Sequence, residues 1–313
     1  MKLLVTGATG FIGSHLVHRL VRDGHSVVAL VRDRAKAKDL PPDVELLDGD
    51  LTLFENVKLE LPACDAVIHL AGVVAADKIE DYDRINFVAV KHLVACIERQ
   101  KWKPKRFLFA SSLAAAGPSE TPMTERDTCA PIEAYGKSKL DAERFLQYAP
   151  FPVTLFRPSV VFGHGDPATI TLFKMAKRGL GFRVAGMNPS LSFIDVDDLV
   201  DGIVRMLADT SRENRTYFVS HPSSTDQRAM WRAIGAAVEK RVMIVPVPRQ
   251  LLYGLMRIGV SSQLDEKQYK QITAPGFVCS STALQQDTGW KPQYDLSSSL
   301  AKAAAGFRRA QWL

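Results

Sequence analysis

Tyr135, Lys139 and Ser112 are the residues whose types and spacing point most clearly to acid–base chemistry. Tyr135 and Lys139 stand four residues apart at the start of a predicted helix, so both project from one helical face. A phenol has an ordinary pKa of about 10, and a neighbouring ammonium lowers that pKa by favouring the phenolate. Ser112 ends a predicted strand and can hydrogen-bond the same substrate oxygen. These residues predict proton transfer to a carbonyl oxygen or from an alcohol.

The first thirteen residues, MKLLVTGATGFIG, predict an element that would hold a cofactor beside these side chains. Lys2–Val5 is apolar enough for a buried strand, and Phe11–Val21 has apolar residues at helical spacing. Between them, Gly7 permits a tight turn, Gly10 lets a pyrophosphate approach the backbone, and Gly13 lets the helix pack closely. Amide groups at a helix N-terminus also favour a bound anion. A strand, glycine loop and helix in this order predict dinucleotide binding.

Apolar segments alternate with helical patterns along the next two hundred residues. The predicted strands are Ser26–Val31, Val44–Leu47, Asp65–Leu70, Phe107–Ala110, Val153–Phe156 and Thr216–Val219, and the predicted helices are Asp77–Arg99, Tyr135–Tyr148 and Ile194–Leu207. This alternation predicts an α/β fold, a Rossmann-type doubly wound parallel sheet with helices on both faces. Ligands bind such sheets at the carboxyl ends of the strands. One edge should therefore gather Gly7, Arg32, Asp50, Ala71, Ser111 and Ser112.

The end of the second predicted strand bears on the choice of cofactor. A carboxylate there suits the ribose 2′-hydroxyl of NAD, whereas an arginine accommodates the 2′-phosphate of NADP. Arg32 follows the strand and offers a planar guanidinium to a phosphate, while Asp33 is the competing residue and would favour NAD. We predict NADP as the cofactor, with NAD as the alternative. Asp50 is either a partner for the adenine amino group or an ordinary turn residue.

Composition argues against several other classes of protein. Apolar residues make up 46% of the chain and charged residues 24%, as in an ordinary globular protein. No apolar run reaches the roughly 18 residues that span a bilayer. The four cysteines form no CxxC pair, which predicts a reduced, cytoplasmic protein without a metal site. The basic cluster at 101–106 has Trp102 as its one aromatic, so we expect a small-molecule substrate and neither nucleic acid nor membrane as partner.

Several motifs together resemble those of the extended short-chain dehydrogenases/reductases, the NAD-dependent epimerase/dehydratase superfamily. They are TGATGFIG, Gly49-Asp50-Leu51, His69-Leu-Ala-Gly72, Asn86, Ser112, Tyr135-x-x-x-Lys139 and Arg157-Pro158. The resemblance covers residues 1 to 210 strongly, and the rest weakly through Thr288–Pro292. Ser112 rather than Ser111 matches the superfamily, because Ser112 stands five residues before Gly117.

The resemblance implies a role for each matching residue. Ser112, Tyr135 and Lys139 would form the catalytic triad, with Asn86 helping a water to relay protons to the lysine. It also implies a homodimer built from the helix of Tyr135 and the helix of Asn86. The residues expected to contact the cofactor are Gly7, Thr9, Gly10, Phe11, Ile12, Gly13, Arg32, Asp50, Leu51, Leu70, Ala71, Gly72, Tyr135, Lys139, Pro158, Ser159 and Val160.

Residues around the expected substrate site distinguish branches of this superfamily. Its sugar-nucleotide epimerases and dehydratases carry an arginine for the substrate diphosphate where this chain has Leu191-Ser192. They also often carry an asparagine where Val160 stands. The segment SSLAAAGPSETPMTE and the second strand that ends in Arg32 resemble the dihydroflavonol-reductase and 3β-hydroxysteroid-dehydrogenase branch, which acts on ketones and secondary alcohols of apolar molecules. We predict an NADP-dependent oxidoreductase. The alternatives are a sugar-nucleotide epimerase or dehydratase that uses the same triad, and a non-catalytic dinucleotide-binding protein.

A discontinuous substrate lobe is expected beside the Rossmann domain. The Rossmann domain would take residues 1–161 and about 193–219, and the smaller C-terminal α+β lobe about 162–192 and 220–313. The most apolar part of this lobe is Met243–Val260, whose apolar side chains at helical spacing fit a buried core or a substrate pocket. They are Leu251, Leu252, Leu255, Met256 and Ile258. Membrane-surface docking is disfavoured there, because only Arg249 and Arg257 supply charge.

Overall fold

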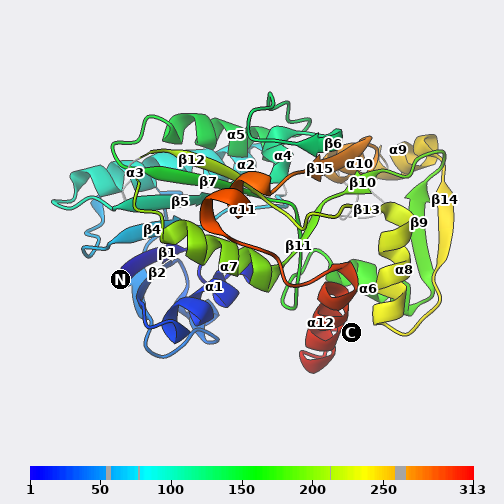
Figure 1. Cartoon of the computed structure of the whole chain (residues 1–313), viewed down its shortest axis with the longest axis horizontal. Coiled ribbons are helices and arrows are strands. Elements are labelled where there is room, and N and C mark those ends of the chain that lie inside the picture. The colour runs from blue at the N-terminus through cyan, green and yellow to red at the C-terminus, as the bar shows by residue number, and fades with distance from the viewer. Residues whose placement is uncertain (54–57, 77, 212, 258–265) are drawn as a thin grey trace.

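A seven-stranded parallel sheet forms the centre of the computed structural model, which describes residues 1–53, 58–76, 78–211, 213–257 and 266–313 (Figure 1). The strand order is β12-β7-β5-β4-β1-β2-β3. The strands are β1 (Lys2–Thr6), β2 (Ser26–Val31), β3 (Glu45–Asp48), β4 (Ala66–His69), β5 (Arg106–Ala110), β7 (Val153–Pro158) and β12 (Arg215–Val219). The predicted Rossmann-type fold is confirmed.

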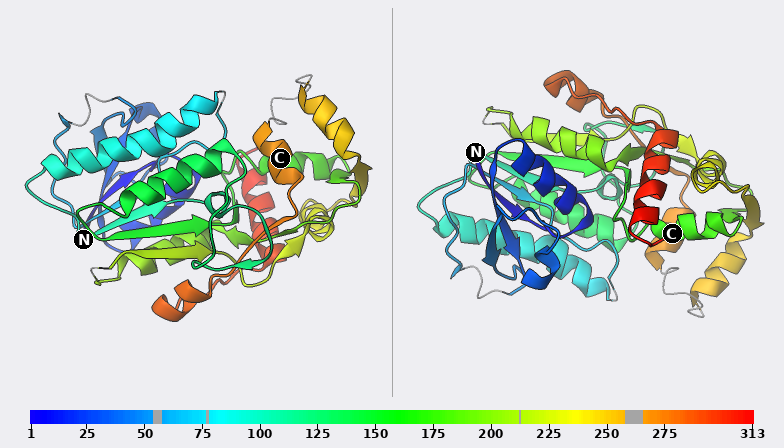
Figure 2. Two further views of the ribbon diagram at one scale, coloured as in Figure 1. Left: turned by 90° about the horizontal axis from the view of Figure 1, so that it is seen from above. Right: turned by 90° about the horizontal axis from the view of Figure 1, so that it is seen from below.

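Helices cover both faces of this sheet, which is why its central strands are mainly apolar and buried along almost their whole length (Figure 2). On one face lie α1 (Phe11–Arg22) and α7 (Val196–Leu207), which contribute Leu16 and Ile203 to the core. On the other face lie α3 (Ala89–Arg99) and α5 (Ala134–Leu146). This arrangement leaves the carboxyl ends of the strands as the edge on which the predicted reactive residues meet.

The predicted helix Asp77–Arg99 is a composite of three segments in the structure. Helix α2 (Ile79–Asp83) runs into a π-helical turn, η3 (Arg84–Val88), and then into α3; Asp77 lies outside the described residues. A π-helical turn widens the backbone ring locally, and such turns are frequent at functional sites. Here the turn carries the buried Asn86.

A second hydrophobic core lies beside the first and belongs to the C-terminal half of the chain (Figure 1). Its helices are α6 (Ile170–Lys177), α8 (Gln227–Ala237) and α12 (Leu296–Arg309). Its two-stranded sheets pair β8 (Val160–Phe162) with β11 (Phe193–Asp195), and β9 (Leu180–Val184) with β14 (Met243–Val247). This core supports the division into two lobes, whose boundaries remain our proposal.

A four-stranded sheet mixes segments from both halves of the chain. Its order is β13 (Thr225–Asp226), β10 (Ser190–Leu191), β15 (Gly276–Cys279) and β6 (Ser119–Met123). Strand β6 thus leaves the first half of the chain to pair with β15 near its end. The shorter elements are η1 (Arg34–Ala37), α4 (Leu113–Ala116), α9 (Arg249–Arg257), α10 (Glu266–Ile272) and α11 (Thr282–Thr288).

The apolar stretch Met243–Val260 is a strand followed by a helix, β14 and then α9. Of its expected core residues, Leu252 is buried, whereas Leu251 is 53% exposed; Ile258 lies outside the described residues. The stripe therefore does not form a buried core face. No helix in the described part of the chain combines the length and the apolar composition needed to cross a bilayer.

Candidate active site

The carboxyl ends of β1, β4 and β5 bring the predicted reactive residues to one edge of the sheet. Gly7 follows β1, Gly72 lies in the loop after β4, and Ser112 begins α4 just beyond β5. The loops after β1 and β4 are in close contact: a Cβ added to Gly7 would stand 2.6 Å from the Ala71 amide nitrogen. Helix α5 carries Tyr135 in its first turn.

Glu133 fixes the start of α5 and thereby the position of Tyr135. Its two carboxylate oxygens accept hydrogen bonds from the backbone amides of Tyr135 at 2.8 Å and Gly136 at 3.0 Å. A Cβ on Gly136 would stand 2.3 Å from the Ala114 carbonyl oxygen, so glycine permits the close approach of α5 to α4. Ser112 caps α4 and is hydrogen-bonded to the Tyr135 phenol. Helix capping and packing thus bring together two residues that the sequence predicted to cooperate.

The Tyr135 side chain is buried, and this decides its protonation state. Burial raises the pKa of Tyr135 to about 12; Glu133 and Tyr82 also raise it, while the hydrogen bond from Ser112 lowers it. The expectation of a lowered pKa is therefore wrong, because desolvation of the phenolate outweighs the favourable contact. Tyr135 is protonated at neutral pH and can act as a proton donor.

Lys139 lies one turn further along α5 and is also buried. Its ammonium group donates a hydrogen bond to the Ala110 carbonyl oxygen at 2.8 Å and lies 5.0 Å from the centroid of the Phe109 ring. Burial lowers the pKa of Lys139 to about 8, against a smaller raising effect of Glu143. Glu143 in turn forms a buried ion pair with Arg157 at 2.5 Å. Lys139 is therefore a cation at neutral pH that loses its proton in mildly alkaline solution.

Asn86 faces the same region from η3 and holds the loop after β4. Its side-chain nitrogen donates to the Val73 carbonyl oxygen at 3.0 Å and to the Ser138 hydroxyl at 3.1 Å, and its oxygen accepts from the Val73 amide at 2.8 Å. A Cβ on Gly72 would stand 2.9 Å from this oxygen and 3.0 Å from the Lys139 nitrogen. Asn86 and Lys139 therefore border one space, and the water relay through Asn86 stays a proposal.

Helix α10 adds two residues to the site that the sequence analysis missed. The ammonium group of Lys267 lies 4.7 Å from the centroid of the Tyr135 ring and donates a hydrogen bond to the Val74 carbonyl oxygen. The side-chain amide of Gln271 donates to Glu133 at 3.4 Å. No local pattern marks these residues, because they approach Tyr135 from a distant part of the chain. Helix α10 thus places Lys267 over the Tyr135 ring and Gln271 beside Glu133.

The glycine loop fits the pyrophosphate of a dinucleotide. A Cβ on Gly13 would stand 2.0 Å from the Gly7 carbonyl oxygen, so the loop and α1 are in backbone contact. A Cβ on Gly10 would meet only the Gly7 carbonyl oxygen, at 3.2 Å, among atoms of the described residues within 4 Å, so the outer side of the loop is open. No side chain caps α1, so its first amides, from Phe11 and Ile12 onward, are available to an anion.

Beyond β2, the structure separates the two residues that competed for the ribose. The Asp33 carboxylate caps η1 by accepting a hydrogen bond from the Ala35 amide at 2.9 Å. Arg34 pairs with Asp48 at 2.9 Å. Arg32 is exposed, and its guanidinium has no ion-pair or hydrogen-bond partner within the described ranges. Arg32 is therefore an unpaired cation at the end of β2, and its contact with a 2′-phosphate remains a proposal.

Other predicted cofactor residues also lie at or near the strand ends, and they differ in their hydrogen bonds and exposure. Asp50 accepts hydrogen bonds from the Thr52 amide at 2.9 Å and the Thr52 hydroxyl at 2.8 Å, which fits a turn residue. The Ser159 hydroxyl donates to the Val219 carbonyl oxygen at 3.3 Å, and Val160 is 37% exposed. The remaining members of the predicted set at these positions are Thr9, Leu51, Leu70 and Pro158.

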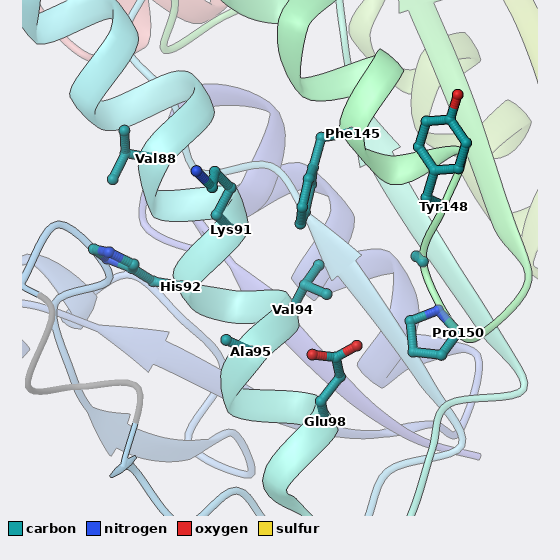
Figure 3. Close-up of a pocket in the computed structure, with 10 residues that line it drawn as sticks. Val88, Lys91, His92, Val94, Ala95, Glu98, Phe145, Tyr148 and Pro150 are labelled. Atoms are coloured by element: carbon teal, nitrogen blue, oxygen red, sulfur yellow. The ribbon is translucent and has the colours of Figure 1, made fainter.

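A groove of about 420 Å³ lies between α3 and the C-terminal end of α5, away from the reactive residues (Figure 3). Val94 and Phe145 form part of its apolar floor, and Lys91 and Glu98 stand at its rim. It is the place where the sequence resemblance puts a dimer contact, and that homodimer remains a proposal.

The fold and this site define a dinucleotide-dependent α/β enzyme, and comparison with known proteins gives its family. The model of the NAD dependent epimerase/dehydratase family matches residues 3–220, and the chain belongs to this family. It is therefore an enzyme of the extended short-chain dehydrogenase/reductase type, in a family that depends on NAD.

Two curated relatives show the range of activities around this chain. It is 30% identical over 201 residues to the ceramide reductase of Caulobacter vibrioides, a match that covers 64% of this chain and 59% of that protein. It is 26% identical over 327 residues to the UDP-glucose 4-epimerase of Vibrio cholerae, which covers 99% of this chain and 96% of that protein. Among solved structures, MoeE5 in complex with UDP-glucuronic acid and NAD superposes with a TM-score of 0.80 at 23% identity, over 99% of this chain and 100% of that one. This structural likeness supports the fold.

Proposed function

We propose that the protein interconverts a carbonyl group and an alcohol through Ser112, Tyr135 and Lys139, as a net oxidoreductase. The observation that carries the proposal is the buried Tyr135 phenol hydrogen-bonded to Ser112, with the buried Lys139 on the same helical face. A bound nicotinamide would supply or accept the hydride at the carbon atom. The glycine loop and Arg32 would hold the dinucleotide, and Lys139 would hold the nicotinamide ribose.

In the direction of reduction, each side chain has one task. Ser112 positions the carbonyl oxygen by hydrogen bonding, and the protonated Tyr135 gives that oxygen its proton. The resulting phenolate is stabilised by the ammonium of Lys139, and Asn86 connects Lys139 to water for reprotonation. The high pKa of the Tyr135 phenol favours carbonyl reduction, since the phenol carries its proton at neutral pH.

The pH dependence follows from Lys139. Its pKa is about 8 in the folded protein, below the ordinary 10.5, so the ammonium is present below pH 8 and is lost above it. We expect kcat/KM for carbonyl reduction to fall as the pH rises through about 8. In Lys139→Arg the side chain stays charged, and the fall should move to higher pH. An unchanged profile in Lys139→Arg would exclude Lys139 as the titrating group. Since the unfolded chain binds this proton more strongly between pH 8 and 10.5, the same group makes folding stability rise with pH there.

Arg32 makes the cofactor preference testable. We expect wild type to bind NADPH more tightly than NADH, because the guanidinium meets the 2′-phosphate in a charge-assisted hydrogen bond. Arg32→Ala should lose about tenfold in NADPH affinity and keep its NADH affinity, as measured by fluorescence titration. Arg34→Ala serves as the control, since Arg34 is already paired with Asp48. Tighter binding of NADH by wild type would favour NAD, the cofactor in the MoeE5 complex.

A sugar-nucleotide epimerase is the second candidate function, and the comparisons favour it. The Vibrio cholerae epimerase matches nearly the whole chain, and the neighbour MoeE5 binds UDP-glucuronic acid. Against it stands the substrate side of this chain. Ser192, at the place of the diphosphate-binding arginine, is buried and hydrogen-bonded to the Cys279 backbone. Charged diphosphates need charge-assisted partners, whereas Leu191 and Ser192 suit an apolar substrate such as the ketone of a lipid.

One experiment separates the two functions. The protein is incubated with NADPH or NADH and either a long-chain aliphatic ketone or UDP-glucose. A net oxidoreductase consumes reduced nicotinamide with the ketone and leaves UDP-glucose unchanged. An epimerase converts UDP-glucose to UDP-galactose without a net change in nicotinamide absorbance, and that result would replace the oxidoreductase proposal.

A further inference from the structure

The end of the second lobe that lies farthest from the seven-stranded sheet concentrates positive charge (Figure 1). Residues 170–187 and 226–257, which include α6, β9, α8, β14 and α9, contain ten Lys and Arg against two Asp and Glu, a net charge of +8. The whole chain has a net charge of +6, so the rest of the molecule is slightly negative. We call the surface formed by α6, β9, α8, β14 and α9 the distal face.

The cations of the distal face are not neutralised within the protein. In the described ranges none of the ten forms an ion pair. Of the two carboxylates, Asp226 caps α8 and Glu239 pairs with Arg308, which lies outside these segments. Arg232, Lys240 and Arg241 line one groove together with Val242 and Ile244. An exposed cluster of like charges destabilises the fold by self-repulsion, so its presence points to an anionic partner.

Exposed aliphatic side chains lie among these cations. Met243 on β14 is 63% exposed and stands opposite Leu180 on β9, which is 44% exposed. Val245, two residues further along β14 and therefore on the same side of the strand, is 39% exposed. In α9, Leu251 is 53% and Tyr253 is 48% exposed. The distal face thus combines a strip of exposed apolar residues with exposed lysines and arginines.

We propose that the distal face docks on an anionic phospholipid membrane, with the apolar strip in the interface and the cations on the headgroups. Peripheral membrane-binding surfaces combine these two features. A second copy of the chain is a poor occupant, because two faces of charge +8 repel each other. Nucleic acid is a poor occupant as well, because bases stack on aromatic rings, whereas the exposed apolar residues here are aliphatic apart from Tyr253, which packs on Tyr269.

This proposal departs from the sequence-based expectation that membrane docking is disfavoured. That expectation counted Arg249 and Arg257 alone, since they are the cations within the apolar stretch. The parallel pairing of β14 with β9 and the packing of α8 on α6 and β9 bring the other eight to the same end. These contacts join segments that are distant in sequence.

The distal face also connects physically to the candidate active site. Tyr253 of α9 packs on Tyr269 of α10 with ring centroids 5.5 Å apart, and Arg249 donates to the Tyr269 hydroxyl at 3.2 Å. Helix α10 carries Lys267, which lies over Tyr135. Docking through α9 would place the substrate side of Tyr135 near the membrane, where a lipid-borne carbonyl group is available.

Flotation of the full chain with lipid vesicles tests the proposal without any measurement of turnover, so it stands or falls separately from the proposed function. The vesicles are phosphatidylcholine alone or with about 30% phosphatidylglycerol, at low and high salt. We expect binding to the anionic vesicles alone, weakened by salt. Each lost positive charge should weaken binding about fivefold. The double variant Lys240→Glu/Arg241→Glu should therefore reduce binding at least tenfold. Met243→Ser/Val245→Ser should reduce it severalfold at unchanged charge.

Arg99→Glu/Lys101→Glu is the matched control. It makes the same change in charge near the end of α3, at the opposite end of the molecule (Figure 1), and should leave binding within about twofold. Circular dichroism establishes that each variant is folded, and the salt and lipid dependence of wild type tests the proposal independently of any variant. Absence of binding to the anionic vesicles overturns it, and so does an equal loss in the control. Retention of binding in Met243→Ser/Val245→Ser, together with equally tight binding to duplex DNA, would show general polyanion binding and reject the membrane.

Discussion

Tyr135→Phe is expected to lower kcat for carbonyl reduction by about 10² to 10⁴-fold, the usual contribution of a positioned proton donor. The substitution removes the one oxygen that gives its proton to the substrate and keeps the ring. Cofactor affinity should stay within about threefold, because the glycine loop and the region around Arg32 are unchanged. Steady-state rates with reduced nicotinamide and a fluorescence titration of the cofactor measure the two quantities.

Tyr82→Phe is the matched control for this prediction. Tyr82 is also buried, its ring centroid lies 6.1 Å from that of Tyr135, and its hydroxyl donates to the Val74 carbonyl oxygen at 3.3 Å. Removal of this second hydroxyl should leave most of the turnover intact. Substantial turnover in Tyr135→Phe, or equal losses in both variants, would contradict the role of Tyr135 as proton donor.

Gly13→Ala is the substitution for which we expect the largest structural effect. The added Cβ would stand 2.0 Å from the Gly7 carbonyl oxygen and 2.9 Å from the Ala8 Cα. Both are backbone atoms, so α1 or the end of β1 must shift. Overpacking of this kind costs about 3 kcal/mol of unfolding free energy, and the shift also distorts the loop that would hold the pyrophosphate. Chemical denaturation and cofactor titration should both show the loss.

Gly254→Ala provides the comparison in another helix. Among the described residues, no atom outside the helix's own backbone lies within 4 Å of the position of its Cβ, and alanine is the better helix former by up to about 1 kcal/mol. We expect unchanged or slightly higher stability and unchanged cofactor affinity. If Gly13→Ala unfolded at the same denaturant concentration as wild type and bound cofactor equally well, the packing of α1 on the glycine loop would not be needed.

The features that could be predicted from the sequence are local ones. The strand, glycine loop and helix from Lys2 to Arg22 are contiguous, so spacing alone indicates their arrangement. Tyr135 and Lys139 share a helical face for the same reason, and strand alternation identifies the sheet edge on which Ser112 lies. These parts of the fold follow from hydrophobic periodicity and turn chemistry.

The features that could not be predicted depend on contacts between distant segments. Lys267 reaches Tyr135 through the packing of α10, and the burial that raises the pKa of Tyr135 is a property of the assembled site. The sequence also did not indicate that Glu133 caps α5, because glutamate is not among the preferred N-cap residues. Likewise, the ten cations of the distal face come together only in the folded lobe.

The position of α12 has a consequence for the synthesis of the protein. Leu300 and Phe307 of this last helix complete the core of the second lobe, and Lys302 forms an ion pair with the buried Asp195. Strand β6 likewise finds its partner β15 only after Gly276–Cys279 has been translated. During synthesis at about 5 to 20 residues per second, the apolar faces of α6 and α8 therefore stay uncovered for several seconds, until the residues of α12 have been made. Such a nascent chain exposes apolar surface that chaperones bind, whereas strands β1 to β5 and β7 of the central sheet can pair as soon as they emerge.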